Sequence, residues 1–238
     1  MLNRLARALV FPLEDRQWLS KIVVGGSVGL LLEVLFVSAG FLFTREFAIA
    51  GSLLAQATNF PALGFVMFVF QGALTVPQAD SMPLWRQWPV LCLKGLLIFM
   101  LGMAYEIIPL LFIVSGFGLL ARGGVALGLG LVLMLLGMLA GITAGFFLPM
   151  GIACYLEERR LEAALHPAAI WSRIRKVLVE YAEAYLLSIG SFIAVGLIGT
   201  VPALGALLWP FLTFYLLVVG ARLFGGICSE AGQEASRP

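Results

Sequence analysis

An almost unbroken apolar run, from Leu91 to Leu120, constrains the fold of this 238-residue chain more than any other feature. About 20 apolar residues span a bilayer as a helix, and a lipid environment leaves no water to satisfy open backbone groups. Hydrophobic residues make up 61% of the chain and charged residues 12%, whereas a soluble domain carries about 25% charged residues. The sequence therefore predicts an all-α fold, an integral membrane bundle of helices.

Apolar runs separated by polar or glycine-rich segments predict about six membrane-spanning helices. The runs cover residues 22–43, 47–76, 90–119, 125–148, 184–201 and 203–224. The second run is interrupted near Pro61, where Asn59 or Thr58 can cap a helix that starts at the proline. Residues 47–57 then form a short outer or re-entrant helix. A four-span arrangement, in which 47–76 is re-entrant and the last two runs are shallow, is the alternative.

The distribution of charge predicts cytoplasmic N- and C-termini. Of the 15 lysines and arginines, only Arg45 and Arg122 fall in segments expected outside. This asymmetry follows the positive-inside rule and indicates an even number of crossings, in the cell inner membrane or an internal membrane. We expect a single membrane domain, with a cytoplasmic N-terminal segment at 1–21 and a flexible tail at 227–238. Near the inside ends lie three cysteines, expected as reduced thiols: Cys92, Cys154 and Cys228.

Residues 157–183 predict a cytoplasmic interfacial helix and not a span. After Pro167, apolar residues recur at helical spacing with charged residues between them: Ile170, Ile174, Val177, Leu178, Tyr181 and Tyr185. One interpretation is that this face packs on the bundle while the charges meet water. The other is contact with anionic lipid headgroups. The residues that would make this contact are Trp171, Arg173, Arg175 and Lys176.

Five stretches occur in a characteristic order: PLEDRQWLSKIVVGG (12–26), LGFVMFVFQGAL (63–74), MPLWRQW (82–88), LKGLLIFMLGMAYEIIPLL (93–111) and FYLLVVGARLFGG (214–226). In this order they resemble a family of prokaryotic multi-pass membrane proteins named domain of unknown function 4013. The family's usual acidic residues after the tryptophan are replaced by Arg86 and Gln87, and 44–60 looks like an insertion. The resemblance implies a helical membrane fold and no activity. The matching motif positions are Pro83, Trp85, Trp88, Gly95, Tyr105 and Pro109.

Glu33 and Glu106 are the only acids deep within the expected spans. Lys21 and Lys94 mark the inside ends of the first and third spans, and Lys94 is a third polar candidate within the membrane. The two acids follow these lysines by 12 residues, which is about 18 Å along a helix. Two parallel spans would place both carboxyls near the bilayer midplane, where ionisation is costly. Either each acid is protonated and hydrogen-bonded, or it handles ions or protons; a lipid or cofactor contact is the third interpretation. For Glu106 the expected acceptor is the carbonyl of Tyr105. In a helix this carbonyl would accept from the N–H of residue 109, but Pro109 has none.

Glycines recur every four residues at Gly137, Gly141 and Gly145, which places them on one helix face. Gly25 and Gly29 repeat the pattern in the first span. Small residues at this spacing let another helix approach closely. The face either packs within the chain or contacts another subunit.

The chain lacks a nucleotide-binding loop, a catalytic triad and a zinc motif, and its single histidine, His166, is expected at the surface. The leading hypothesis is a non-catalytic structural or assembly subunit without cofactor or metal. Its partners would be membrane lipids and another membrane protein or a second copy, not nucleic acid. The alternative is a small transporter or channel component that uses Glu33 and Glu106, and a membrane enzyme ranks third. A pore needs a continuous polar path, for which the spans offer mainly Gln71, Thr143, Ser188, Ser191 and Thr213.

Overall fold

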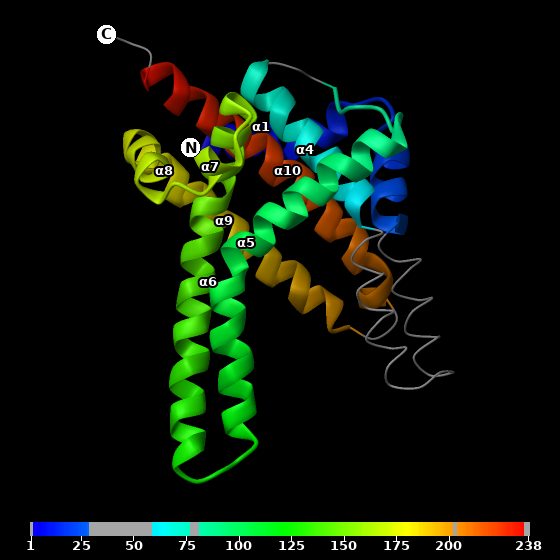
Figure 1. The fold of residues 1–238 in the computed structure, drawn as a ribbon. Coiled ribbons are helices and arrows are strands. Elements are labelled where there is room, and N and C mark those ends of the chain that lie inside the picture. Colours follow the sequence, from blue (N-terminus) through cyan, green and yellow to red (C-terminus); the bar gives the residue numbers. More distant parts are fainter. Residues whose placement is uncertain (1, 29–58, 77–80, 202–203, 236–238) are drawn as a thin grey trace. The chain divides into compact units, whose positions relative to one another are not determined.

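The computed structural model describes residues 2–28, 59–76, 81–201 and 204–235, and it contains no β-strand in those ranges (Figure 1). Four helical segments there are long and apolar enough to cross a membrane, so the prediction of an all-α membrane bundle is confirmed. Their bounds are Trp88–Leu120, Val125–Glu158, Pro167–Gly199 and Leu207–Gln233. Two shorter apolar helices cover Trp18–Val28 and Phe60–Thr75.

The elements follow one another in this order: α1 (Leu2–Glu14), the helix Trp18–Val28, α4 (Phe60–Thr75), α5 (Trp88–Leu120), α6 (Val125–Glu158), α7 (Leu161–Ala164), α8 (Pro167–Ile174), the 3₁₀ turn η1 (Arg175–Val177), α9 (Leu178–Gly199) and α10 (Leu204–Ala235). The chain divides into two compact units, and a single membrane domain stays a prediction. The first unit comprises Met1–Ile98 and Arg173–Pro238, and the second comprises Phe99–Ser172. Helix α5 contributes its first part to one unit and the rest to the other.

In the first unit α10 is the central helix, and it packs against α4, α9 and α1. Half of its membrane-length window is buried within the chain, compared with 11% for the windows of the other three long helices. Phe65 of α4 and Tyr181 of α9 are fully buried, and the Tyr181 ring meets Phe224 of α10 edge-on. Large apolar side chains from three helices therefore form the core of this unit.

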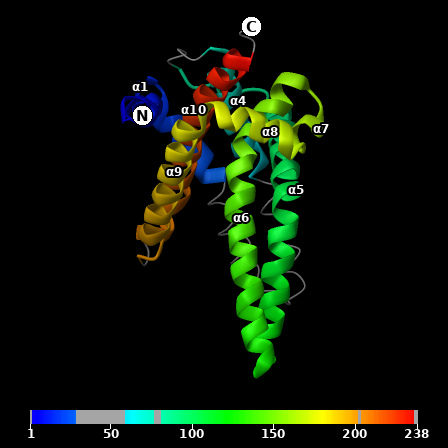
Figure 2. The ribbon, with the colours of Figure 1, turned by 90° about the vertical axis from the view of Figure 1, so that its left-hand side faces the viewer.

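The second unit is built on the antiparallel pair of α5 and α6, which lie side by side in both views (Figures 1 and 2). The connecting turn contains Gly123 and Gly124, whose φ angles of +70° and +58° lie in the left-handed region that glycine tolerates best. The backbones then approach closely. A Cβ added at Gly116 or at Gly130 would lie 2.7 Å from the carbonyl oxygen of the other glycine. Glycines thus hold this pair together, as is typical of helices packed in lipid.

Residues 157–183 do not form one continuous helix, and their placement at the membrane interface stays a prediction. Helix α6 continues to Glu158, and α7, α8 and η1 lead into α9. Pro167 does begin a helix, as predicted, because its fixed φ suits a first turn. Much of the predicted apolar face is buried, but Leu178 is exposed because the 3₁₀ turn interrupts the helical spacing. The buried members are Ile170, Ile174, Val177 and Tyr181.

Two other predicted boundaries can be compared with the structure. Helix α4 begins at Phe60 after Asn59, close to the prediction, although the Asn59 side chain makes no capping hydrogen bond. The predicted flexible tail is helical over 227–235, where Ile227 and Ala231 are buried. The first predicted span beyond residue 28, the segment 47–57, Gly29 and Glu33 lie outside the described residues.

Candidate functional site

Asp15 and Lys21 form a buried ion pair, with 2.7 Å between Oδ2 and Nζ and 6% of each side chain exposed. Asp15 also accepts hydrogen bonds from the backbone N–H groups of Gln17 (2.8 Å) and Met82 (2.9 Å). Lys21 donates a second hydrogen bond to the Met82 carbonyl at 2.8 Å. We call Asp15, Lys21 and Met82 the Asp15 cluster; it fastens the segment before Pro83 to the start of the chain.

Electrostatics within the Asp15 cluster favour the charged pair. Burial alone would raise the pKa of Asp15, but hydrogen bonds from Lys21, Gln17 and Met82 lower it below its ordinary value on balance. A buried carboxylate is tolerated when it is paired and hydrogen-bonded, as here. The sequence identified Lys21 only as an inside end of a span. The signal missed was Asp15 six residues earlier, within the resemblance stretch 12–26.

The motif tryptophans extend this attachment into the core of the first unit. Trp85 donates its indole N–H to the Lys21 carbonyl at 3.1 Å. Its ring stacks on Phe65 at 4.5 Å between centroids and on Trp88 at 5.4 Å. Pro83 is half-buried in the same segment. The motif MPLWRQW therefore has a structural role, joining the N-terminal segment to α4 and α5.

Lys94 is bound to its neighbours on α4 and is not an isolated intramembrane charge. Its ammonium donates to the Gln71 Oε1 at 2.7 Å and lies 3.6 Å from the centre of the Phe68 ring. A cation over an aromatic face is attracted by the ring quadrupole. Gln71, one of the polar residues considered for a pore, thus accepts a hydrogen bond from Lys94.

Glu106 lies at the contact between α5 and α6. A Cβ added at Gly141 would be 3.6 Å from its Oε2 and 3.7 Å from the Pro109 Cβ. No hydrogen bond of the Glu106 carboxyl is found among the described residues, so the expected bond to the Tyr105 carbonyl is not made there. Protonation of Glu106 at neutral pH stays a prediction.

The glycine face of α6 packs within the chain. A Cβ at Gly137 would lie 2.7 Å from Ile113 Cγ1 and 3.0 Å from the Pro109 carbonyl oxygen. In the first unit, a Cβ at Gly25 would lie 2.2 Å from the Phe214 ring. At Gly137 and Gly25 the small residue therefore allows close packing within the chain. Gly145 lies on the same helix and is half-buried.

Tyr105, another motif position, fastens α7 to the hairpin. Its hydroxyl donates to the Ala164 carbonyl, and Gly151 leaves room for it, because a Cβ there would lie 2.5 Å from the hydroxyl oxygen.

Tyr105→Phe removes the donor and leaves a carbonyl unpaired, so we expect a loss of about 1 kcal/mol in the free energy of unfolding. Thermal unfolding in one detergent measures it. Tyr155→Phe is the control and should be silent; equal melting shifts would contradict this assignment.

The basic residues proposed to contact headgroups lie where α8 meets η1. Arg173 is half-buried at the end of α8, and Arg175 and Lys176 are exposed on η1. Trp171 is exposed, with its ring 6.1 Å from that of Phe147. Contact of this group with lipid stays a prediction.

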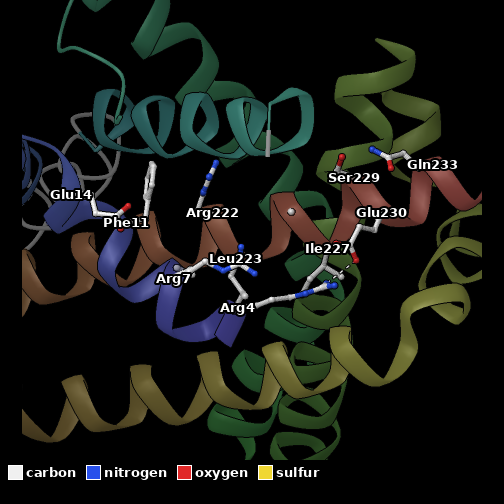
Figure 3. A pocket seen from close by; sticks show the side chains of 12 residues that line it. Arg4, Arg7, Phe11, Glu14, Arg222, Leu223, Ile227, Ser229, Glu230 and Gln233 are labelled. Carbon is white, nitrogen blue, oxygen red and sulfur yellow. Dashed lines mark hydrogen bonds and ion pairs between the residues drawn. The ribbon is translucent and has the colours of Figure 1, made fainter. Parts of the chain in front are cut away.

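A cavity of about 400 Å³ between α1 and the C-terminal half of α10 was not anticipated from the sequence (Figure 3). Its lining residues come from opposite ends of the chain, so no local sequence pattern predicts the cavity. At one end, Arg4 bridges Glu180 at 2.9 Å and Glu230 at 2.7 Å. The hydrogen bond to Glu230 raises the pKa of Arg4 above its ordinary value. Within the described part of the chain, no cluster of three or more His, Cys, Asp or Glu could hold a metal.

The chain matches one protein family over residues 48–204, more than half of its length. This range contains five motif positions whose surroundings are described above: Pro83, Trp85, Trp88, Tyr105 and Pro109. No curated protein and no solved structure shows a significant match. The chain belongs to the family described as Protein of unknown function (DUF4013).

Proposed function

We propose that the protein is a non-catalytic membrane subunit that works through helix–helix and lipid contacts. The observation that carries this proposal is the low burial of the long apolar helices. In α5 and α6, only 11% of the residues in the membrane-length window are buried within the chain. Exposed apolar residues on α6 lie at helical spacing, with 54% of Leu131, 58% of Leu135 and 57% of Met138 exposed. Such surfaces are suited to lipid or to another apolar helix.

The state of the polar side chains favours this role over a transport path. The Thr143 hydroxyl donates to the Leu139 carbonyl at 2.9 Å, and Ser188 donates to the Ala184 carbonyl at 2.8 Å. Both groups are therefore satisfied within their own helices. With Gln71 bound to Lys94, three of the five polar residues considered for a pore have local partners.

Photo-crosslinking along α6 in native membranes tests the proposal. A photoreactive residue is placed in turn at Leu131, Leu135 and Met138. Neighbouring positions among these three should give a discrete adduct with the same second polypeptide, which is either another membrane protein or a second copy of the chain. Met134 is the control, because it contacts Gly116 of α5 and should crosslink only within the chain. Absence of any protein adduct at the exposed positions would contradict the proposal. If the purified protein carries a proton flux in proteoliposomes, and Glu106→Gln abolishes this flux, the transporter alternative is established.

We infer that both termini face the cytoplasm in a multi-pass arrangement, from the charge asymmetry of the sequence. Single cysteines at Arg122 and Glu162, both exposed, are suited to the test. In sealed cells a membrane-impermeant thiol reagent should label the cysteine at 122 and spare the one at 162. The native Cys154 and Cys228 are buried, which limits background. Labelling of residue 162 from outside would reverse the orientation.

A further inference from the structure

Helix α1 is apolar around most of its circumference. Its three charged residues, Arg4, Arg7 and Glu14, lie three and seven residues apart, so they share one edge of the helix. Every other residue from 4 to 14 is apolar. The helix therefore has one charged edge and apolar surface on its remaining sides.

One apolar face of α1 packs on α10, which belongs to the same compact unit. Ala8 and Phe11 are buried in this contact. The Phe11 ring centre lies 4.7 Å from the guanidinium carbon of Arg222, and Arg4 donates to Glu230 at 2.7 Å. Helix α1 thus lies beside the C-terminal part of α10, as the close view shows (Figure 3).

The opposite face of α1 is apolar but exposed. Ala6, Leu9, Val10 and Leu13 recur at positions i, i+3, i+4 and i+7, the spacing of one helix face, and all four are exposed. A helix turns by about 100° per residue, which puts this face nearly opposite the buried one. A surface helix of a water-soluble protein carries polar residues there, so this face is not suited to water.

The position of α1 along α10 indicates that lipid covers this face. The membrane-length segment of α10, Leu207–Gln233, has 27 residues and is about 40 Å long, whereas the hydrocarbon core of a bilayer is about 30 Å thick. Its two charged residues, Arg222 and Glu230, lie toward the C-terminal end, so this end extends into the headgroup region. Because both contact α1, that helix lies at the boundary between acyl chains and headgroups.

The exposed apolar surface continues beyond α1. In the following helix, Trp18–Val28, the side chains of Leu19 and Val23 are exposed. Tyr215, nearer the middle of the α10 segment, donates its hydroxyl to the Leu9 carbonyl and holds α1 at this level. A bilayer covers neighbouring helices alike, which favours lipid over a partner protein on this face.

We propose that α1 lies in the membrane interface, with Leu9, Val10 and Leu13 against lipid acyl chains and the edge that carries Glu14 toward the headgroups and water. An apolar face beside a charged edge is typical of helices that lie in the interface plane. Charge distribution alone predicts a cytoplasmic segment at 1–21. The proposal rests on the membrane insertion of the bundle and needs no partner protein, so crosslinking along α6 can fail while it holds.

Spin-label accessibility in vesicles of dioleoylphosphatidylcholine tests this placement. The full chain with Cys92→Ser carries one nitroxide-labelled cysteine in turn at Leu9, Val10, Leu13 or Glu14; the two other native cysteines are buried. At the first three positions, collisions with oxygen should exceed those with a water-soluble nickel chelate and give a depth of about 5–10 Å. Glu14 is the matched control, next to Leu13 but on the charged edge, and there the nickel chelate should collide more often than oxygen.

Two results would overturn the placement. If the nickel chelate reaches the label at Leu9, Val10 or Leu13 as readily as the label at Glu14, that face lies in water. If neither reagent reaches the three apolar positions, protein covers the face, which in these vesicles means a second copy of the chain.

Discussion

Gly95→Ala is expected to lower the free energy of unfolding by about 3 kcal/mol, the upper end of the usual penalty for overpacking. A Cβ at Gly95 would lie 1.8 Å from the Phe60 carbonyl oxygen, at the N-terminus of α4. The two backbones also approach one turn earlier in α5, where the Leu91 carbonyl oxygen would lie 1.9 Å from a Cβ added at Gly64 of α4. The neighbours are backbone atoms, so the added methyl group cannot be accommodated by a side-chain rotation and the helices must separate.

Thermal or detergent-titrated unfolding measures this loss, with glycines in open space as controls. Gly72 in α4 and Gly102 in α5 have no heavy atom within 4 Å of an added Cβ. Their alanine variants should be as stable as the wild type or gain about 0.5–1 kcal/mol, because alanine favours the helix. A Gly95→Ala protein as stable as Gly102→Ala would show that α4 and α5 do not approach at this point.

Lys21→Met should cost about 3–5 kcal/mol, because it leaves Asp15 charged and buried without its partner. Both side chains are 6% exposed, so water cannot replace the lost ammonium. The double variant Asp15→Asn, Lys21→Met should recover much of this loss, since no unpaired charge remains. Lys176→Met, on an exposed side chain, is the control and should change little. An equal loss in the single and double variants would contradict the coupling.

The same cluster predicts a pH dependence. The pKa of Asp15 is lowered from its ordinary value of 3.8, so its contribution to stability is present above pH 3.8 and is lost as pH falls through the folded-state pKa. Unfolding measured between neutral pH and pH 3 should therefore show a steeper acid loss in the wild type than in the double variant. Parallel curves would mean that another carboxyl causes the acid loss.

Features set by local composition could be predicted from the sequence. The apolar runs gave the long helices, and the glycines and proline near 123 and 167 marked a turn and a helix start that the structure confirms. Helices α9 and α10 pack against each other, and Gly205 donates its N–H to the Val201 carbonyl at 2.9 Å. Helix ends were less predictable. Helix α10 continues to Ala235 because its last turns have a buried face that only the tertiary structure supplies.

The site contacts required knowledge of which distant segments meet. Asp15 and Lys21 lie six residues apart, but the backbone of Met82 completes their hydrogen bonds. Arg4 and Glu230 lie at opposite ends of the chain. Lys94 was recognised as a polar group in an apolar run, yet its partner Gln71 belongs to another helix. Residue types thus indicated the candidates, whereas tertiary packing decided their partners.

We propose that the chain acts as one subunit of a membrane assembly through the apolar faces that it does not bury itself. The most direct measurement is the mass of particles extracted from native membranes in a lipid-retaining polymer, without detergent. We predict a defined mass above that of one chain with its lipids, which falls when Leu135→Asn places an amide on the exposed face of α6. Particles that contain one copy of this chain and lipid alone, with unchanged mass in that variant, would contradict the claim.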